Sequence, residues 1–256
     1  MFENSSGYDG RDRVQSLAVE IVSIHVPKTA GTSFRRTLEA AYGAAAVLLD
    51  YADDPADPCG QRTLDPERYR ERVTHEPLDG RARVIHGHFH AAKYNHLPAV
   101  KRIAFLREPV DNLLSIFYYW KQLPAEGGHG LFRYFRQNDL SVVDLARLPT
   151  IGRLYSHVYF DGFALASLDF IGFTETYTQD LRRLSCLLER PLVEHSDNRN
   201  PHPTYRDEVR ALREDFALLT RLRDLLIEDV RFYERARAIA HRRHAAHLAV
   251  GAAPAS

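Results

Sequence analysis

The sequence has few cysteines and no excess of charge of either sign. Its 256 residues include two cysteines, Cys59 and Cys186, in unlike contexts far apart in the chain. Two such thiols exclude a disulfide framework and a four-cysteine metal site, and they favour a reducing compartment. Lysine plus arginine equals aspartate plus glutamate at 34 each, so the overall charge indicates no nucleic-acid partner and any basic site must be local.

Long apolar runs are also missing, both at the start of the chain and within it. Residues 1–16 are polar and lack the apolar stretch of a signal peptide. Nowhere does a run of about 18 apolar residues occur, as a membrane-spanning helix requires. We therefore expect a cytoplasmic protein without a transmembrane segment, and the sequence leaves a peripheral membrane association open.

The chain nevertheless has enough apolar residues for a substantial core, since hydrophobic residues make up 45% of it. Its length fits one domain. We expect a disordered segment over residues 1–17, one domain over residues 18–240, and a flexible tail rich in arginine, histidine and alanine over residues 241–256.

Strands and helices alternate in the predicted order of elements. Apolar runs rich in β-branched residues predict four strands, at 19–26, 82–86, 102–106 and 168–173. Helical patterns follow the first and third strands, cover 131–166 and 176–189, and recur from Tyr205 onward, whereas the polar residues 50–65 predict a loop. This alternation predicts an α/β fold, a P-loop NTPase-like three-layer sandwich with a central, mainly parallel sheet flanked by helices. Ligands of such sheets bind at the carboxyl ends of the strands.

The segment Pro27-Lys-Thr-Ala-Gly-Thr-Ser33 stands between a predicted strand and a predicted helix. The first N–H groups of a helix have no intrahelical partner, and the helix dipole adds positive potential there, so such a turn favours a phosphate or sulfate. Lys28 adds a full positive charge, Gly31 allows a ligand to approach closely, and hydroxyl donors come from Thr32 and Ser33. An ordinary strand–helix turn with a serine or threonine cap is the alternative interpretation.

This segment differs from the ATP-binding P-loop in the place of its lysine. Lys28 precedes Gly31, whereas the P-loop lysine follows a glycine and precedes a serine or threonine. No Gly-Lys-Ser or Gly-Lys-Thr occurs in the chain, and no acidic residue clearly ends a strand where it could hold Mg²⁺. The segment therefore predicts a site for a phosphate-bearing donor that reacts without a metal.

A second strand–turn–helix pattern runs over Arg102-Ile-Ala-Phe-Leu-Arg-Glu-Pro-Val-Asp-Asn-Leu-Leu-Ser-Ile-Phe-Tyr-Tyr119. Arg107 ends the strand, and its planar fork of donors suits a phosphate. Ser115, two turns into the helix, adds a hydroxyl donor. In the alternative interpretation Arg107 pairs with Glu108 or Asp111 as a helix-cap ion pair, and Ser115 is an ordinary helix residue.

Histidines cluster in Val84-Ile-His-Gly-His-Phe89, at the end of another predicted strand. Imidazole is the side chain best suited to accept a proton near neutral pH, so His86 and His88 are candidates for a general base. With His90 they also form an H-x-H-x-H run, which keeps a zinc site open as an alternative, although no cysteine ligand lies nearby. The chain has 13 histidines, so a surface or structural role is a third interpretation.

The segment Ile24-His-Val-Pro-Lys-Thr-Ala-Gly-Thr-Ser-Phe34 resembles the 5′-phosphosulfate loop of the carbohydrate sulfotransferases related to heparan sulfate 2-O-sulfotransferase. Segments similar to that family continue as far as Ala236. The resemblance implies a sulfotransferase that uses 3′-phosphoadenylyl sulfate (PAPS) as donor and releases adenosine 3′,5′-bisphosphate, with no metal required. It assigns the phosphosulfate end of PAPS to the loop residues Lys28, Thr29, Ala30, Gly31, Thr32 and Ser33.

The same resemblance assigns roles to individual cationic and hydroxyl side chains. It implies that Lys28 neutralises charge on the oxygen that bridges sulfur and phosphorus as the leaving group departs. It also implies that Arg107 and Ser115 bind the 3′-phosphate of PAPS. Arg199 lies where relatives have a loop that closes over the nucleotide, and it is a further candidate ligand.

The histidine roles follow from the same family. The resemblance implies that His88 is the catalytic base that takes the proton of a hydroxyl acceptor, and that His86 supports it. We expect this acceptor to be a carbohydrate or glycolipid. Two departures leave its identity open, because the segment between the first two motifs is short and the stem and membrane anchor of the animal enzymes are missing. A kinase-like, nucleotide-dependent phosphotransferase and a non-catalytic nucleotide-binding module remain alternatives, and the oligomeric state is not indicated.

Overall fold

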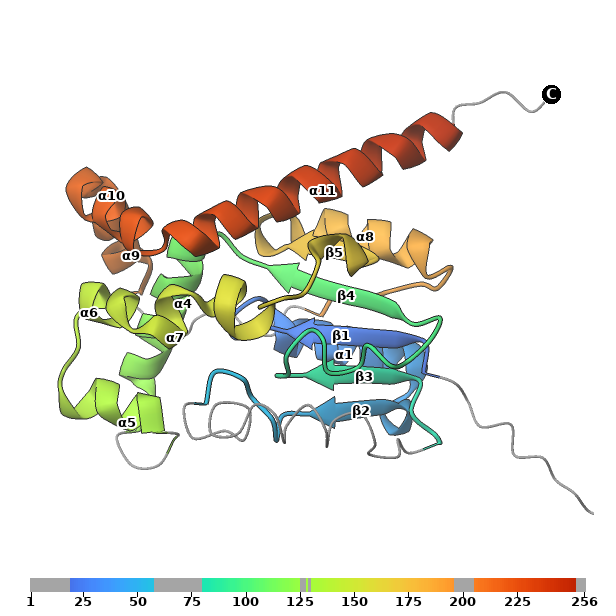
Figure 1. The fold of residues 1–256 in the computed structure, drawn as a ribbon, viewed down its shortest axis with the longest axis horizontal. Helices are drawn as coiled ribbons and strands as arrows, with labels where there is room; N and C mark the ends of the chain where they lie inside the picture. Colours follow the sequence, from blue (N-terminus) through green and yellow to red (C-terminus); the bar gives the residue numbers. More distant parts are fainter. Residues whose placement is uncertain (1–18, 58–79, 125–127, 129, 196–204, 252–256) are drawn as a thin grey trace, which may run out of the picture.

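A five-stranded parallel sheet forms the centre of the protein (Figure 1). The computed structural model describes residues 19–57, 80–124, 128, 130–195 and 205–251. The strands lie in the order β2-β3-β1-β4-β5. Their bounds are β1 (Ile21–His25), β2 (Val47–Asp50), β3 (Val84–Gly87), β4 (Lys101–Leu106) and β5 (Phe170–Phe173).

Helices and helical turns connect these strands. The longer described helices are α1 (Gly31–Tyr42), α4 (Pro109–Gln122), α5 (Gly130–Gln137), α8 (Tyr177–Leu187), α9 (Tyr205–Glu214), α10 (Phe216–Leu225) and α11 (Ile227–Gly251). The shorter elements are η1 (Ala44–Ala46), α6 (Val142–Arg147), α7 (Pro149–Gly152), the π-helical segment η2 (Leu154–Tyr159), η3 (Leu165–Ser167) and η4 (Thr174–Thr176).

Helices cover both faces of the sheet, because alternate residues of a strand point to opposite sides. Ile21 packs in a cluster with residues of α1 and α8, whereas Val22 and Ile24 pack in a larger cluster with residues of α4 and α11. The prediction of a three-layer α/β sandwich with a parallel central sheet is therefore confirmed.

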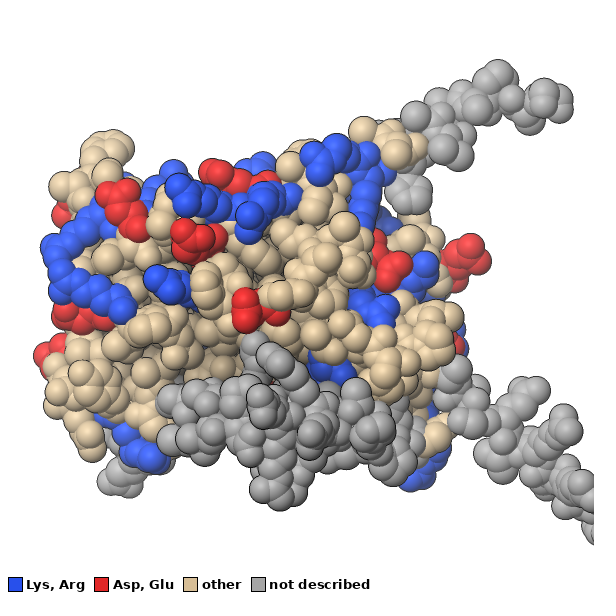
Figure 2. Space-filling model, viewed as in Figure 1, with Lys and Arg blue, Asp and Glu red and all other residues tan. Residues whose placement is uncertain are grey.

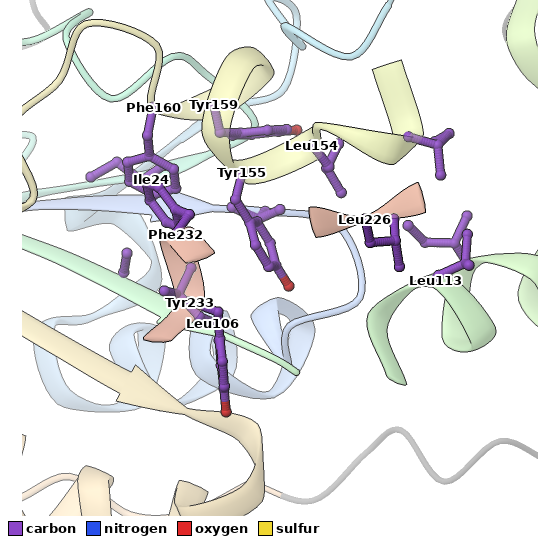
Figure 3. Packing of buried hydrophobic residues seen from close by; sticks show 14 of the residues in the cluster. Ile24, Leu106, Leu113, Leu154, Tyr155, Tyr159, Phe160, Leu226, Phe232 and Tyr233 are labelled. Carbon is purple, nitrogen blue, oxygen red and sulfur yellow. The ribbon is translucent and has the colours of Figure 1, made fainter. Parts of the chain in front are cut away.

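The larger cluster contains η2, which packs against α11 (Figure 3). Tyr155 and Tyr159 of this segment are 1% and 0% exposed. The ring of Phe232, from α11, lies 6.0 Å from the ring of Tyr155 and 5.1 Å from that of Phe160, measured between centroids. Aromatic side chains bury large apolar areas, so this packing stabilises a helical form that is otherwise rare.

A buried carboxylate fixes the start of η2. Asp229, near the start of α11, accepts hydrogen bonds from the backbone N–H groups of Tyr155 (2.9 Å) and Ser156 (2.8 Å) and from the Ser156 hydroxyl (2.7 Å). Burial raises the pKa of Asp229 to about 6, and the three hydrogen bonds offset this only in part. In this way α11 orients the segment that carries Tyr155 and Tyr159.

The structure differs from the sequence prediction at three places. β2 was not predicted, because its apolar residues follow three alanines, which favour a helix, and lead into the polar stretch predicted as a loop. Residues 131–166 form several short helices and turns instead of one helical region. α11 continues to Gly251, into the predicted tail, and Arg243 in this part of the helix donates hydrogen bonds to the backbone carbonyls of Leu168 and Ala166. The predicted disordered segment 1–17 lies outside the described residues.

The surface of the described residues carries mixed charge. On the face shown in Figure 2, lysine and arginine side chains gather over α10 and α11, with aspartate and glutamate among them. No described helix combines the length and the apolar character that crossing a bilayer requires.

The topology brings the three sequence motifs to one edge of the sheet. β1 is the central strand, and its neighbours β3 and β4 run parallel to it, so the carboxyl ends of all three strands meet. The register pairs Ile24 with Gly87 and His25 with Phe105. The segments that follow these strands therefore start side by side.

Candidate active site

The turn between β1 and α1 has an unusual backbone. Lys28 and Ala30 both have φ of 65°, in the left-handed region that residues other than glycine rarely adopt. The Thr29 hydroxyl closes the turn by donating to the carbonyl of Val26 at 2.8 Å. Non-glycine residues held in this way mark backbone strain that the surrounding structure must maintain, as is common where a loop binds a ligand.

The N-terminus of α1 has no side-chain cap. The N-cap residue is Ala30, whose carbonyl accepts the first helical bond from Phe34 at 3.0 Å. Neither Thr32, which is exposed, nor Ser33, which is buried, caps the helix. The alternative of a serine- or threonine-capped turn is therefore wrong, and the first-turn N–H groups remain able to bind an anion.

Gly31 is required by a neighbouring side chain. A methyl group on this residue would lie 1.7 Å from Nε2 of His25, so the imidazole of His25 packs directly on the glycine backbone. We expected Gly31 to allow a ligand to approach closely, whereas in the structure the group that approaches it is the side chain of His25. A small cavity beside this contact is lined in part by His86 and Phe34.

Lys28 and Arg107 lie close enough for their charges to interact. Burial, with a further contribution from the positive charge of Arg107, lowers the pKa of Lys28 to about 8. The Lys28 ammonium lies over the ring of Tyr119, 3.8 Å from its centroid. The side-chain amide of Asn112 on α4 donates to the carbonyl of Pro27 at 2.9 Å, which ties the first motif to the second.

The carboxylates of Glu108 and Asp111, which follow Arg107 in the sequence, interact with residues other than Arg107. Glu108 caps α4 by accepting from the N–H of Asp111 at 2.9 Å, and it lies 3.5 Å from Arg223 of α10. Asp111 pairs with Arg213 of α9 at 2.7 Å. Within the described ranges no carboxylate pairs with Arg107, so the alternative of a helix-cap ion pair for Arg107 is wrong.

Tyr155 holds the backbone at the end of β4. Its hydroxyl donates to the carbonyl of Arg107 at 2.9 Å and accepts from the N–H of the same residue at 3.3 Å. Ser115 lies on α4 and is 8% exposed. Arg199 lies outside the described residues. A 3′-phosphate site made by Arg107 and Ser115 thus stays a prediction, and so does the role of Arg199 as a ligand of the nucleotide.

Three imidazoles and a tyrosine lie together at the ends of β1 and β3. The ring of His25 stacks on His86 at 5.1 Å and meets His88 edge-on at 4.4 Å, and Tyr51 lies 4.9 Å from His88, all between centroids. The hydroxyl of Ser23 and Nδ1 of His86 are 2.8 Å apart. Burial, and then the charge of His88, lower the pKa of His86 to about 3, so this imidazole is neutral at physiological pH.

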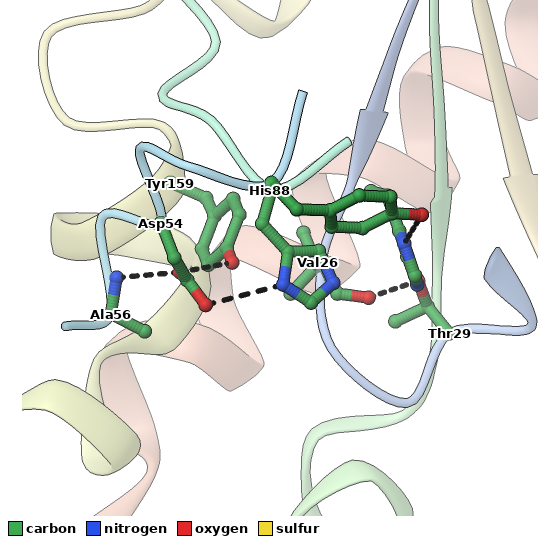
Figure 4. A network of polar contacts seen from close by, with 8 residues as sticks. Val26, Thr29, Asp54, Ala56, His88 and Tyr159 are labelled. Atoms are coloured by element: carbon green, nitrogen blue, oxygen red, sulfur yellow. Dashed lines mark hydrogen bonds and ion pairs between the residues drawn. The ribbon is translucent and has the colours of Figure 1, made fainter. Parts of the chain in front are cut away.

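His88 is the member of this cluster that contacts a carboxylate (Figure 4). Its Nδ1 lies 3.2 Å from Oδ2 of Asp54, and its Nε2 is buried without a hydrogen-bond partner in the described part of the chain. No three histidine, cysteine, aspartate or glutamate side chains of the described residues come together as a metal site would require.

Sequence reasoning missed several residues of this site. His25 lies two residues before the predicted anion loop, and its place near a strand end was the available signal. Asp54 lies in the stretch predicted as a loop. Tyr155 and Tyr159 lie in a π-helical segment, which has no recognisable sequence period.

No family model and no curated protein sequence matches the chain. The chain is similar to a sulfotransferase from Alicyclobacillus acidocaldarius, with 15% identity and a TM-score of 0.38, over 81% of this chain and 95% of that one.

Two further solved structures are similar at the same level. Mouse sulfotransferase SULT7A1 complexed with PAP has 15% identity and a TM-score of 0.29, over 77% of this chain and 64% of that one. Retinol dehydratase in complex with androsterone and inactive cofactor PAP has 15% identity and a TM-score of 0.36, over 85% of this chain and 81% of that one. Likeness this weak carries no argument about activity, which must come from the side chains of the site.

Proposed function

We propose that this protein is a sulfotransferase that takes a sulfuryl group from PAPS and transfers it to a hydroxyl of a carbohydrate or glycoconjugate. The observation that carries the proposal is the pair of neighbouring cations, Lys28 and Arg107, at the ends of β1 and β4. Neither forms an ion pair with a carboxylate of the described residues. A nucleotide with two phosphate-bearing positions supplies negative charge to both cations at once.

The loop before α1 suits the reacting end of this donor. In the proposed reaction a bond forms between the acceptor oxygen and sulfur, and the bond from sulfur to the bridging oxygen breaks. Negative charge then develops on the phosphate of the leaving adenosine 3′,5′-bisphosphate. The Lys28 ammonium and the uncapped N–H groups of α1 stabilise this charge, and they need little reorganisation because the turn is already formed.

His88 suits the role of base. Its unpartnered Nε2 accepts the proton that the acceptor hydroxyl loses as it attacks sulfur. His86 cannot share this task, because its pKa of about 3 keeps it from holding a proton at neutral pH. The role of His86 is to support the cluster, through its hydrogen bond with Ser23 and its ring contact with His25.

Titration calorimetry with nucleotides tests the donor class. We expect wild-type protein to bind adenosine 3′,5′-bisphosphate more tightly than ATP with Mg²⁺, and Lys28→Ala to weaken binding of the bisphosphate. Arg107→Ala is the matched variant for the second phosphate. It should remove the preference for the bisphosphate over adenosine 5′-monophosphate while leaving the monophosphate affinity nearly unchanged, since that ligand lacks the 3′ group.

A transfer assay with ³⁵S-labelled PAPS tests the reaction. We expect label on a hydroxyl-bearing carbohydrate or glycolipid acceptor, and none with His88→Ala, which should still bind the bisphosphate. Preference for ATP with Mg²⁺ would instead indicate a phosphotransferase. Bisphosphate binding without transfer to any acceptor would indicate a non-catalytic nucleotide-binding module.

A further inference from the structure

The carboxylate of Asp54 is held in one orientation beside His88. Asp54 lies in the turn that follows β2, and its Oδ2 is 3.2 Å from Nδ1 of His88 (Figure 4). Its Oδ1 accepts two further hydrogen bonds, from the hydroxyl of Tyr159 at 2.8 Å and from the N–H of Ala56 at 2.8 Å. Both oxygens are therefore engaged, and the carboxylate has little freedom to turn away from the imidazole.

This contact selects one tautomer of His88. An ionised carboxylate only accepts hydrogen bonds, so the proton of a neutral imidazole beside it lies on Nδ1. The lone pair is then on Nε2, the nitrogen that is buried and has no partner among the described residues. A general base needs this arrangement, with one nitrogen bound to an orienting group and the other directed at the substrate.

We propose that Asp54 is a positioning residue for His88, which fixes the Nδ1–H tautomer and stabilises the imidazolium that forms during transfer. This inference rests on the proposed function for the identity of the reaction. The proton of the acceptor hydroxyl moves to Nε2 as the bond between oxygen and sulfur forms, and Asp54 stays ionised throughout. Tyr159 acts one step further away, because its hydroxyl holds the carboxylate in place.

The surroundings favour an ionised Asp54. Burial by itself raises the pKa of this carboxyl, but the hydrogen bond and charge of His88, with the bonds from Ala56 and Tyr159, outweigh it and lower the pKa below its usual value. The other two imidazoles have different partners at Nδ1, the hydroxyl of Ser23 for His86 and that of Tyr51, at 3.3 Å, for His25.

The position of Asp54 also depends on elements far away in the chain. Tyr159 ends η2, whose first N–H groups are bound by Asp229 of α11. Tyr159 and Asp54 therefore come from segments other than β3, the strand that precedes His88. Packing of α11 on η2 therefore helps to fix Tyr159, which holds the carboxylate of Asp54, and Asp54 in turn contacts His88.

¹⁵N spectra of the histidine side chains in the free protein test the tautomer directly. We expect wild-type His88 to be mainly the Nδ1–H tautomer when neutral, and Asp54→Asn to shift the population measurably toward Nε2–H. Asp53→Asn is the matched control, since this neighbouring carboxylate pairs with Lys93 at 2.8 Å. An unchanged tautomer in Asp54→Asn, or the same shift in Asp53→Asn, would overturn the proposal.

Kinetics separate positioning from folding or donor binding. In the transfer assay we expect Asp54→Asn to lower kcat by about 10²- to 10⁴-fold, with KM for PAPS and the affinity for adenosine 3′,5′-bisphosphate within about twofold of wild type. Tyr159→Phe, which keeps the carboxylate, should lower kcat less. Full kcat in Asp54→Asn would refute the role of Asp54 even if the protein is a sulfotransferase.

A reciprocal measurement covers the case in which Asp54→Asn does not fold. The pKa of Asp54, followed by ¹³C carboxyl shifts, should rise in His88→Gln, because His88 lowers it in the wild type. An unchanged pKa of Asp54 in this variant would mean that His88 does not contact the carboxylate. If wild-type protein binds no bisphosphate, the proposed function fails, whereas the tautomer and carboxyl measurements still decide whether Asp54 positions His88.

Discussion

Binding of adenosine 3′,5′-bisphosphate should change the protonation of Lys28. Burial and the charge of Arg107 lower the pKa of Lys28 from 10.5 to about 8 in the unliganded protein. This lowering corresponds to at most about 3 kcal/mol against the charged ammonium, at about 1.4 kcal/mol per pKa unit, because Lys28 is partly exposed and solvent screens part of it. A phosphate dianion beside the two cations favours the charged form, so binding should raise the pKa and draw a proton onto Lys28.

The size of the effect depends on pH in a defined way. At pH 8 about half of the Lys28 side chains in the free protein lack the proton, so binding should take up about half a proton, whereas at pH 7 the uptake is only about a tenth. The ligand phosphates have second pKa values near about 6 and are almost fully ionised at pH 8. Uptake at that pH therefore reports on Lys28, and above pH 8 the affinity should fall by up to about tenfold per pH unit.

Calorimetry in buffers of different ionisation enthalpy measures this proton uptake. Lys28→Met should abolish the uptake of half a proton at pH 8. Any uptake that remains in this variant comes from other groups that titrate in the same range. Arg107→Gln should reduce it, because loss of the like charge raises the pKa of free Lys28. The reasoning is refuted if wild-type protein binds the bisphosphate at pH 8 without proton uptake, or if Lys28→Met takes up as much as the wild type.

Two further substitutions test the packing behind the site. Gly31→Ala places a methyl group 1.7 Å from Nε2 of His25, and we expect this overpacking to cost about 1–3 kcal/mol in urea unfolding but little in a His25→Ala background. Equal costs in both backgrounds would contradict the contact. Asp229→Asn turns an amide NH₂ toward N–H donors, so we expect about 1–3 kcal/mol less stability at pH 7 by the same assay. Unchanged stability would mean that this carboxylate does not anchor η2.

The sequence allowed Lys28, Arg107 and His88 to be predicted together because each lies at or just beyond the end of a strand with a clear apolar pattern. The carboxyl ends of parallel strands lie at the same edge of a sheet, so three local patterns were enough to predict that these residues lie near one another. Asp54 escaped prediction because it follows β2, a short strand that the apolar pattern did not predict. Tyr159 escaped it because its partner, Asp54, lies 105 residues away in the chain.

By itself, the sequence determined the α/β class, the edge of the sheet at which the candidate site residues lie and the chemical types of side chain there. These follow from apolar periodicity and strand–helix order, which are local properties of the chain. Only the tertiary structure decided that Arg213 and Arg223 pair with the carboxylates beside Arg107, and that of the clustered imidazoles of His25, His86 and His88 the last contacts a carboxylate. Ion pairs and hydrogen bonds of this kind join segments that meet only after α10 packs on α4 and η2 packs on α11, so no short-range pattern contains them.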